Sequence, residues 1–158
     1  MPQPLIDIGI PAPQREAIAA GLGRLLADSY TLLLKTHGYH WNVEGPMFNT
    51  LHEMFSVQYV ELQTAVDEIA ERIRALGVKA PGSLGAFAGL SSIGEPGAAP
   101  SAEQMIADLL AGNEAVVRTA RAVLPLAQEA RDESSTDLLI ERMRLHEKTA
   151  WMLRSMLA

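Results

Sequence analysis

The amino-acid sequence predicts an all-α fold, a four-helix bundle with one long crossover between the second and third helices. Apolar residues recur at intervals of three and four along four long segments, which is the period of a helix face that packs against other helices. Residues 78–100, between the second and third segments, are rich in Gly, Pro, Ala and Ser. A connection of this length in a small bundle is typical of a crossover. No segment has the period of two that indicates a strand, and the 158 residues suit one domain.

The first predicted helix follows a Pro-rich segment, residues 1–13, which we expect to form an extended N-terminal arm. The helix is expected to begin near Gln14 and to reach Val43. Gly45 and Pro46 then separate it from the next helix, because Gly suits the residue after a helix and Pro suits a first turn. The apolar positions of the first helix are Ile18, Leu22, Leu25, Leu26, Leu32 and Leu33.

The second predicted helix has the clearest periodicity in the sequence. Its apolar positions, all three or four residues apart, are Leu51, Phe55, Tyr59, Leu62, Val66, Ile69, Ile73 and Leu76. Glu68 and Arg72 are four residues apart and are expected to form an ion pair on its surface. Gly77 ends the helix. Within the crossover that follows, we expect one short helical turn near residues 84–90.

The last two long helices are predicted from their ends. Ser101 and Gln104 have the spacing of a capping box, so the third long helix is expected to begin there. Pro125 is expected to kink or end this helix. Residues 134–137 (Ser-Ser-Thr-Asp) predict the start of the fourth helix. His146 lies in the apolar stripe of that helix, so we interpret it as a hydrogen-bonded core histidine rather than a metal ligand.

The composition excludes several functions. The chain has no Cys, which removes disulfides, thiolate metal sites and thiol catalysis. A formal net charge of −6 disfavours broad binding to nucleic acid, whose phosphates require Lys and Arg. No uninterrupted apolar run approaches the roughly 18 residues of a membrane span, and the first residues lack the pattern of a secretory signal. We therefore expect a cytoplasmic protein.

The second helix carries polar residues that suit a metal. His52 and Asp67 are 15 residues apart, about 22 Å along a helix, so one metal cannot bridge them within a chain. Asp67 and Glu71 are four residues apart and share a helix face. Two copies of this helix, packed antiparallel about a two-fold axis, would bring His52 of one chain to both carboxylates of the other. His40 could join them where the first two helices meet. The spacing predicts a metal site shared between subunits.

The same residues carry a resemblance to a known family. The joined pattern consists of His40-Trp41-Asn42, Gly45-Pro46, Phe48, Leu51-His52, the run Asp67–Arg72, and His146-Glu147-Lys148 with Trp151. This pattern resembles the Dps family of mini-ferritins over nearly the whole chain. The resemblance implies a ferritin-like subunit that assembles into a hollow homo-oligomer, a dodecamer. It also implies ferroxidase sites at the two-fold dimer interfaces, a ferric oxide core, and hydrogen peroxide, in preference to oxygen, as the oxidant.

By this resemblance, the metal ligands and catalytic residues are His40 and His52 of one chain with Asp67 and Glu71 of its partner. Imidazole and carboxylate ligands suit Fe(II), and less selectively Zn(II) or Mn(II). Iron would be oxidised there and move as Fe(III) to a carboxylate-lined interior, which stores iron and protects the cell from oxidative damage. Trp41 would lie beside the site, where its ring could intercept a stray oxidising equivalent.

One position departs from the family pattern. The family usually has an acidic residue one helical turn after the second histidine, where this chain has Ser56. Because a hydroxyl is a poor iron ligand, the other four ligands can still hold one metal, but Ser56 puts a second adjacent iron in doubt. We therefore expect a weaker or differently loaded site. His37, three residues before His40, is a candidate replacement ligand. Glu53 is not, since it is turned about 100° from His52 on the helix.

Two further acidic residues have a candidate role. Asp137 and Glu141 lie four residues apart near the start of the fourth helix. In the family that this chain resembles, this region lines the three-fold pores through which iron passes, so both are candidate pore residues. Acidic residues at a helix start also stabilise the helix dipole, which is the alternative interpretation.

Two other functions were compared with iron oxidation. Direct DNA binding is not expected, because no basic residue precedes Arg15 and a dodecamer would carry a charge of about −72. The alternative is a Dps-like shell with an impaired iron site, of which Ser56 would be the sign. Because histidine binds metal in its neutral form, we expect iron loading to weaken below roughly pH 6.

Overall fold

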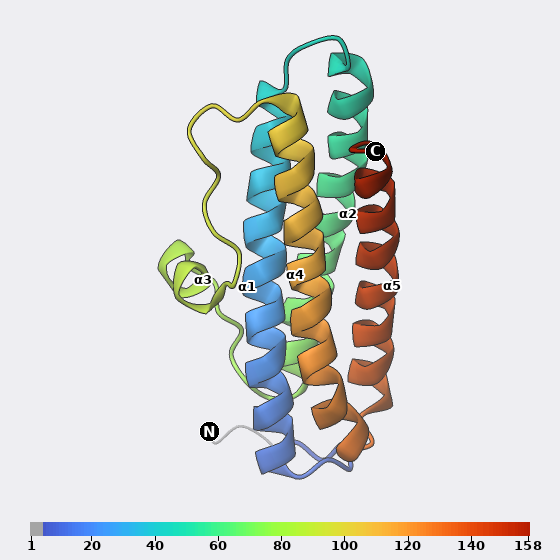
Figure 1. The fold of residues 1–158 in the computed structure, drawn as a ribbon. Helices are drawn as coiled ribbons and strands as arrows, with labels where there is room; N and C mark the ends of the chain where they lie inside the picture. The colour runs from blue at the N-terminus through green and yellow to red at the C-terminus, as the bar shows by residue number, and fades with distance from the viewer. Residues whose placement is uncertain (1–4) are drawn as a thin grey trace.

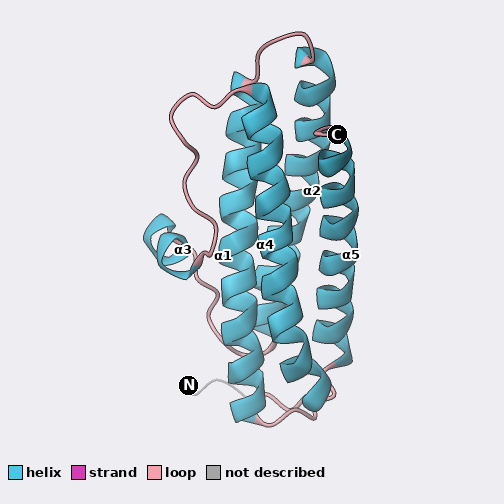
Figure 2. Cartoon of the chain, in the orientation of Figure 1, coloured by secondary structure: helices cyan, strands magenta, loops and turns pink. Residues whose placement is uncertain are grey.

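The computed structural model of the protein describes residues 5–158 and consists of helices joined by loops. The helices are α1 (Ala12–Asn42), α2 (Phe48–Ala75), α3 (Leu84–Leu90), α4 (Ala102–Glu129) and α5 (Glu133–Ser155). Figure 2 shows no strand in the described part of the chain. The predicted all-α bundle with a crossover between the second and third long helices is therefore confirmed.

The four long helices lie side by side, and the short helix α3 lies outside them against α1 (Figure 1). Helix α1 packs against α2 and α4, and α4 packs against α5, whereas α2 and α5 contact each other only slightly. Two glycines let α1 and α4 approach closely. A Cβ atom at Gly21 would lie 2.7 Å from Val123 Cγ1, and one at Gly112 would lie 2.7 Å from Leu32 Cδ1. A side chain at Gly21 would collide with Val123, whereas one at Gly112 would meet only the end of the flexible Leu32 side chain.

The first helix begins earlier than predicted, at Ala12 rather than Gln14, and it ends at Asn42. Pro11 is its N-cap and Pro13 lies in its first turn, where the missing backbone N–H has no helical partner to lose. The predicted arm over residues 1–13 is therefore shorter than expected. Residues 5–11 precede the helix, and residues 1–4 lie outside the described part of the chain.

Helix α1 is also apolar enough to be considered as a membrane span. It contains an 18-residue window with a mean hydropathy of 1.3, and 67% of that window is buried inside the bundle. The core helix of a globular bundle has the same length and composition, so the burial assigns α1 to the core.

The predicted stripe of α2 packs into the bundle, but its predicted surface ion pair does not form. Arg72 does not pair with Glu68. Its Nη2 atom donates to Asp132 Oδ1 at 2.8 Å, and its Nε atom donates to Ser135 Oγ at 2.8 Å. Burial alone would raise the pKa of Asp132, but hydrogen bonds from Ser135 and the charge of Arg72 bring it below its usual value. A buried carboxylate gains more from this guanidinium than exposed Glu68 would.

The crossover is held to the bundle by a buried carboxylate. Asp28 of α1 accepts hydrogen bonds from the Ser91 hydroxyl, from the backbone N–H and hydroxyl of Ser92, and from the Thr119 hydroxyl of α4. Helix α3, just before these serines, begins at Leu84 with Ser83 as its cap, in agreement with the predicted short turn. These bonds link α1, the crossover and α4 at one point.

The ends of α4 and α5 agree with the sequence in part. The capping box is present, with Ser101 and Gln104 bonded reciprocally. Pro125 does not end α4, which continues to Glu129. Helix α5 begins at Glu133, before the predicted Ser-Ser-Thr-Asp segment, because the Asp132 side chain accepts from the backbone N–H of Ser135 and so acts as the cap.

Candidate metal site

The end of α1 and the start of α2 bring two histidines together. Gly45 has a φ angle of +108°, a backbone conformation that residues with a side chain rarely adopt. The short turn around Gly45 folds α2 back along α1. The His40 and His52 rings then lie face to face, with centroids 3.8 Å apart and planes 15° apart. His40 Nδ1 lies 2.7 Å from the backbone oxygen of His52, and His52 Nδ1 lies 2.7 Å from that of His40.

This reciprocal bonding fixes the tautomer of both rings. A carbonyl oxygen can only accept a hydrogen bond, so both Nδ1 atoms must carry the proton and donate it. In the neutral rings each Nε2 atom is then left with its lone pair. No hydrogen bond to either Nε2 is formed by residues 5–158. Histidines that bind a metal usually donate their other ring N–H to a carbonyl or carboxylate group, so this arrangement is compatible with metal binding through Nε2.

Aromatic side chains surround this pair. Tyr59 lies edge-on to His40 at 5.1 Å between ring centroids, and the ring of Phe48 is stacked with His52 at 5.1 Å. The His37 ring lies between Trp41 and Tyr59, and its centroid is 4.1 Å from the centroid of each of these rings. The centroids of His37 and His40 are 6.2 Å apart. His37 therefore packs among aromatic rings rather than stacking with the histidine pair. Trp41 is 60% exposed beside it.

The two acidic candidates lie elsewhere on α2. Asp67 and Glu71 are both exposed, and no hydrogen bond or ion pair to either is formed by residues 5–158. Within that range no group of three His, Asp or Glu side chains could hold a metal ion. A single chain thus presents two separate halves, the histidine pair at one end of α2 and the carboxylate pair one long helix segment away.

The remaining sequence candidates lie on exposed or partly exposed helix faces. Ser56 is half-buried one turn after the histidine of α2, and Glu53 is exposed. On α5, Asp137 and Glu141 are both exposed, and Glu141 lies 3.9 Å from Arg144. The structure of one chain brings neither of them to the histidine pair. Their predicted role at a pore stays a prediction.

His146 is a core residue, as its position in the apolar stripe predicts. Its Nε2 atom accepts from Arg142 Nη2 at 2.8 Å, since a guanidinium only donates. Its Nδ1 atom therefore carries the proton and donates to Asn113 Oδ1 at 2.7 Å. Burial, followed by the charge of Arg142, lowers the pKa of His146 to about 3. The ring stays neutral and has no nitrogen left for a metal.

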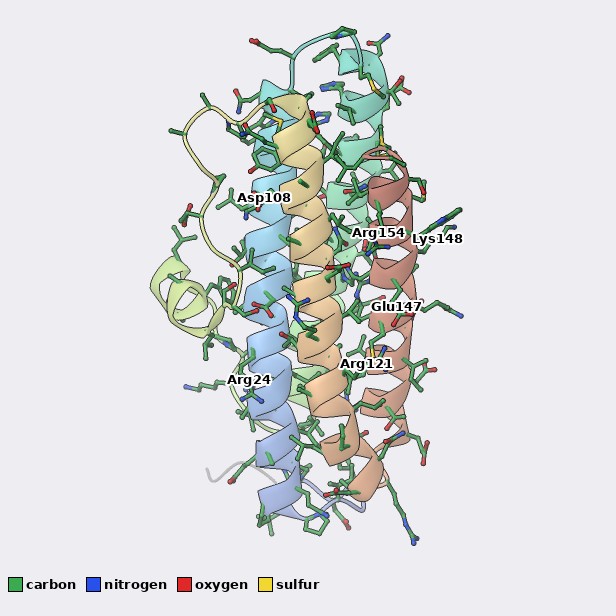
Figure 3. All side chains as sticks on the ribbon, viewed as in Figure 1. Arg24, Asp108, Arg121, Glu147, Lys148 and Arg154 are labelled. Carbon is green, nitrogen blue, oxygen red and sulfur yellow. The ribbon has the colours of Figure 1, made fainter. Side chains whose placement is uncertain are left out.

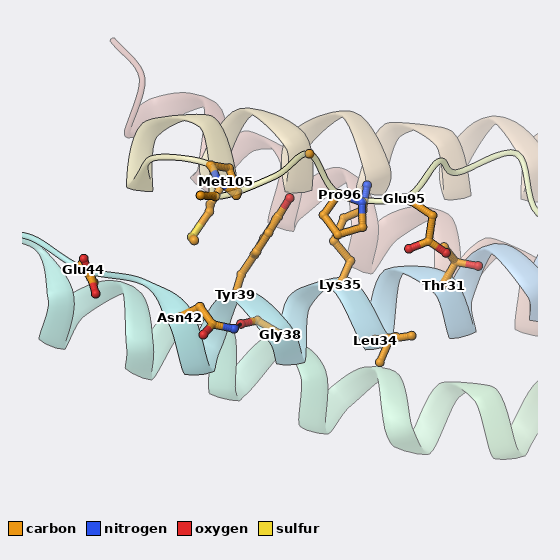
Figure 4. Close-up of a pocket in the computed structure, with 13 residues that line it drawn as sticks. Thr31, Leu34, Lys35, Gly38, Tyr39, Asn42, Glu44, Glu95, Pro96 and Met105 are labelled. Atoms are coloured by element: carbon orange, nitrogen blue, oxygen red, sulfur yellow. Dashed lines mark hydrogen bonds between the residues drawn. The ribbon is translucent and has the colours of Figure 1, made fainter.

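A hollow of about 640 Å³ lies between α1, the crossover and the start of α4, and no histidine lines it (Figure 4). Its only deeply buried charge is the ammonium group of Lys35, which donates to Asp108 Oδ1 at 3.0 Å. The Tyr39 hydroxyl donates to the other oxygen of Asp108, and burial together with that carboxylate raises the pKa of Tyr39. The sequence did not predict this cluster, because Asp108 is 73 residues from Lys35. The only feature of the sequence that could have indicated this cluster is the presence of Lys35 and Tyr39 at positions of α1 that face the core.

Comparison with known proteins identifies the family of the chain. The family model described as the ferritin-like domain matches residues 19–158. A low temperature-induced protein of Nostoc sp. is 41% identical over 154 residues, covering 96% of this chain and 86% of that protein. DNA protection during starvation protein 2 of Bacillus anthracis is 39% identical over 136 residues, covering 86% of this chain and 93% of that protein.

Solved structures lead to the same family. The Dps protein from Vibrio cholerae, described as a member of a broad superfamily of ferritin-like diiron-carboxylate proteins, superposes with a TM-score of 0.93 and 31% identity. The match covers 100% of this chain and 99% of that one. Together with the ferritin-like match over most of the chain, these findings show that the protein belongs to the Dps family of mini-ferritins.

Proposed function

We propose that this protein oxidises Fe(II), with hydrogen peroxide as the oxidant, and stores the Fe(III) inside a hollow homo-oligomer in the cytoplasm. The observation that carries the proposal is the reciprocal bonding of His40 and His52, which leaves both Nε2 lone pairs free. The core histidine His146 differs, because both of its ring nitrogens are hydrogen-bonded within the chain. Membership in a family of ferritin-like proteins supports iron as the metal.

A second copy of the chain completes the site in this proposal. The histidine pair supplies neutral nitrogen ligands but no negative charge, and Asp67 and Glu71 supply charge without nitrogen. If two α2 helices pack antiparallel about a two-fold axis, the pair of one chain meets the carboxylates of its partner, and each dimer has two such sites. Nitrogen and carboxylate ligands together suit Fe(II), with Zn(II) or Mn(II) as competitors. A dodecamer of six such dimers would enclose the storage cavity.

The stacking of the rings favours two iron ions per site rather than one. Rings with centroids 3.8 Å apart and planes 15° apart must lie face to face, because coplanar rings would overlap at that distance. Their planes are then roughly 3.5 Å apart, the usual contact distance between carbon atoms. The lone pair of a histidine Nε2 atom lies in the plane of the imidazole ring, so a bound metal lies in that plane, about 2.1 Å from the nitrogen. One ion cannot lie in both planes, so each histidine binds its own ion, despite the hydroxyl at Ser56.

Two neighbouring Fe(II) ions match the electron count of the reaction. Hydrogen peroxide takes two electrons when its O–O bond breaks, and each Fe(II) supplies one as it becomes Fe(III). Two protons convert the oxygen atoms to two molecules of water. Because both electrons leave together, no hydroxyl radical is released, and iron storage and protection from oxidative damage become one activity. The chain's own groups hold the ions.

The proposal is tested by loading the protein with Fe(II) without oxygen, adding hydrogen peroxide, and following ferric absorbance against protein-free buffer. The wild-type protein is expected to oxidise iron faster than buffer, and Asp67→Ala is expected to abolish the difference. Glu68→Ala removes an exposed carboxylate next in sequence and should leave the rate unchanged. A wild-type rate equal to buffer would refute the ferroxidase and leave the alternative, a Dps-like shell with an impaired iron site.

Stoichiometry tests the second part of the proposal. Anaerobic calorimetric titration should show two Fe(II) ions per histidine pair, and His40→Ala should reduce this to one. Ser56→Asp restores a carboxylate one turn after His52 and is expected to tighten Fe(II) binding. One ion per pair in the wild type would show that the rings reorient to share a metal.

A further inference from the structure

One anionic ligand is missing from the iron site proposed above, on which this inference rests. The proposed ligands are two neutral nitrogens from one chain and two carboxylates from its partner, and Ser56 stands where the family usually has another acid. His37 does not replace that acid, because its ring is held between Trp41 and Tyr59. Oxidation adds one positive charge to each ion, so the ferric site needs a further anionic oxygen more than the ferrous site does.

Tyr59 lies on the same face of α2 as His52 and Ser56. The three residues follow one another at intervals of four and three positions, which places them in one row along the helix. A helical side chain leans toward the N-terminus of its own helix, so the Tyr59 ring extends from its backbone in the direction of Ser56 and His52. The phenol is therefore directed toward the position of the missing carboxylate.

The ring of Tyr59 is also held against two histidines of α1. It stacks on His37, with centroids 4.1 Å apart and planes 24° apart. It lies edge-on to His40, with centroids 5.1 Å apart and planes 65° apart. These contacts limit the motion of a side chain that is only half-buried. The tyrosine is thus fixed beside a histidine whose Nε2 atom forms no hydrogen bond within residues 5–158.

The hydroxyl of Tyr59 likewise has no hydrogen-bond partner among residues 5–158. The hydroxyl of Tyr39, by contrast, donates to Asp108 of α4 (Figure 3). Tyr30 stacks on Phe87 of α3 and contacts neither histidine of the pair. The sequence has three tyrosines, all in the described part of the chain, and Tyr59 alone combines an unbonded hydroxyl with contact to a proposed iron ligand.

The distances allow one ion to bind both side chains. An ion on the Nε2 atom of His40 lies about 3 Å from the centre of that ring, since the metal–nitrogen bond is about 2.1 Å long. A phenolate oxygen bonded at about 2 Å keeps the centre of its own ring about 4.5 Å from the ion. The two ring centres are 5.1 Å apart, which is less than the two reaches together and more than their difference. The two ring centres and the ion can therefore form a closed triangle.

We propose that the phenolate of Tyr59 binds the iron ion held by His40 once that ion is ferric, in place of the carboxylate missing at Ser56. The phenol loses its proton to water as its oxygen binds the ion, so the site gains one negative charge. Fe(III) gains more from an anionic oxygen than Fe(II) does, because its charge is higher. Tyr59 therefore retains the oxidised ion at the site before it moves to the interior.

The bond between a phenolate and Fe(III) has an optical signature, because charge transfer from the phenolate to the ion absorbs visible light. The assembled wild-type protein is loaded without oxygen with two Fe(II) ions per histidine pair, mixed with hydrogen peroxide, and followed by stopped-flow spectroscopy. We expect a visible band that ferric ions in protein-free buffer lack. Tyr59→Phe preserves the ring contacts and removes the hydroxyl, so it should lose the band. Tyr30→Phe is the matched control and should keep it.

A second route separates this proposal from the ferroxidase. Fe(III) added to the iron-free assembled protein as its citrate complex should give the same band without an oxidation step. In competition with citrate, the wild type should bind Fe(III) about tenfold more tightly than Tyr59→Phe. A band by this route with a wild-type oxidation rate equal to buffer would refute the ferroxidase and keep Tyr59 as a ligand. No band by either route, whatever the rate of oxidation, or a band that persists in Tyr59→Phe, would overturn the role of Tyr59.

Discussion

The histidine pair at the end of the bundle and the histidine in its core start from the same tautomer. His40, His52 and His146 each carry the proton on Nδ1 and donate it to an oxygen atom. They differ at Nε2. The Nε2 atom of His146 accepts a hydrogen bond from Arg142, whereas residues 5–158 form no hydrogen bond to Nε2 of the other two. The hydrogen bonding of one ring nitrogen separates the structural histidine from the two proposed metal ligands.

Burial accounts for the rest of the difference. His146 is 3% exposed and neutral because charging it would place a second cation beside Arg142 without solvent. His40 and His52 are only half-buried, so an incoming cation can reach them. The same side chain is therefore suited to stability in the core and to metal binding at the end of the helices.

Removing the core histidine and removing one histidine of the pair, in separate variants, should give the largest effects. The first should lower stability and the second should lower the rate of iron oxidation. His146→Ala leaves Arg142 and Asn113 without their partner, so we expect the free energy of unfolding to fall by about 2–4 kcal/mol while iron oxidation persists. His52→Ala should reduce ferrous oxidation at least tenfold with little change in stability. Chemical denaturation and peroxide-driven ferric absorbance measure the two quantities. Similar losses of both quantities in the two variants would show that the core histidine and the histidine pair do not have different roles.

The core histidine should also make stability depend on pH. Unfolded His146 takes up a proton near its ordinary pKa of 6.5, whereas the folded residue does so only near 3. Between these values the unfolded state binds more protons, so stability falls as the pH drops, by up to about 1.4 kcal/mol per pH unit. Denaturation at pH 7, 6 and 5 measures this slope.

The control for this slope is His146→Gln, which should flatten it above pH 5. Asp132 also loses stabilising interactions in acid because its folded pKa is lowered, but its contribution begins only near its ordinary value of 3.8. The two groups are therefore separated by pH. An unchanged slope in His146→Gln would show that other groups cause it.

Local patterns predicted the fold well. The stripe of α2, the capping box at Ser101 and the long crossover all follow from short-range spacing, and each is present in the structure. Pro125 was less decisive than its usual role indicates, since α4 continues past it to Glu129. Packing of α4 against α1 and α5 stabilises a helix that its own sequence would interrupt.

Long-range partners were not predictable in this way. Arg72 has Glu68 at the favourable spacing but binds Asp132, 60 residues away, because that carboxylate is buried. Similarly, the sequence placed His40 near His52 but could not show that each ring bonds the other's backbone. That bonding depends on the turn at Gly45, and it determines which nitrogen is free.

His37 should show the smallest effect and provides the finest test of the comparison. It was a candidate to replace the carboxylate missing at Ser56, but its ring is held between Trp41 and Tyr59, 6.2 Å from His40. His37→Phe preserves this stacking and removes both nitrogens, so Fe(II) affinity should change less than twofold in anaerobic titration. A loss of tenfold or more would make His37 a ligand. In that case stacking among aromatic rings would not exclude metal binding. Only an Nε2 atom without a hydrogen bond would then distinguish a metal-binding histidine from a structural one.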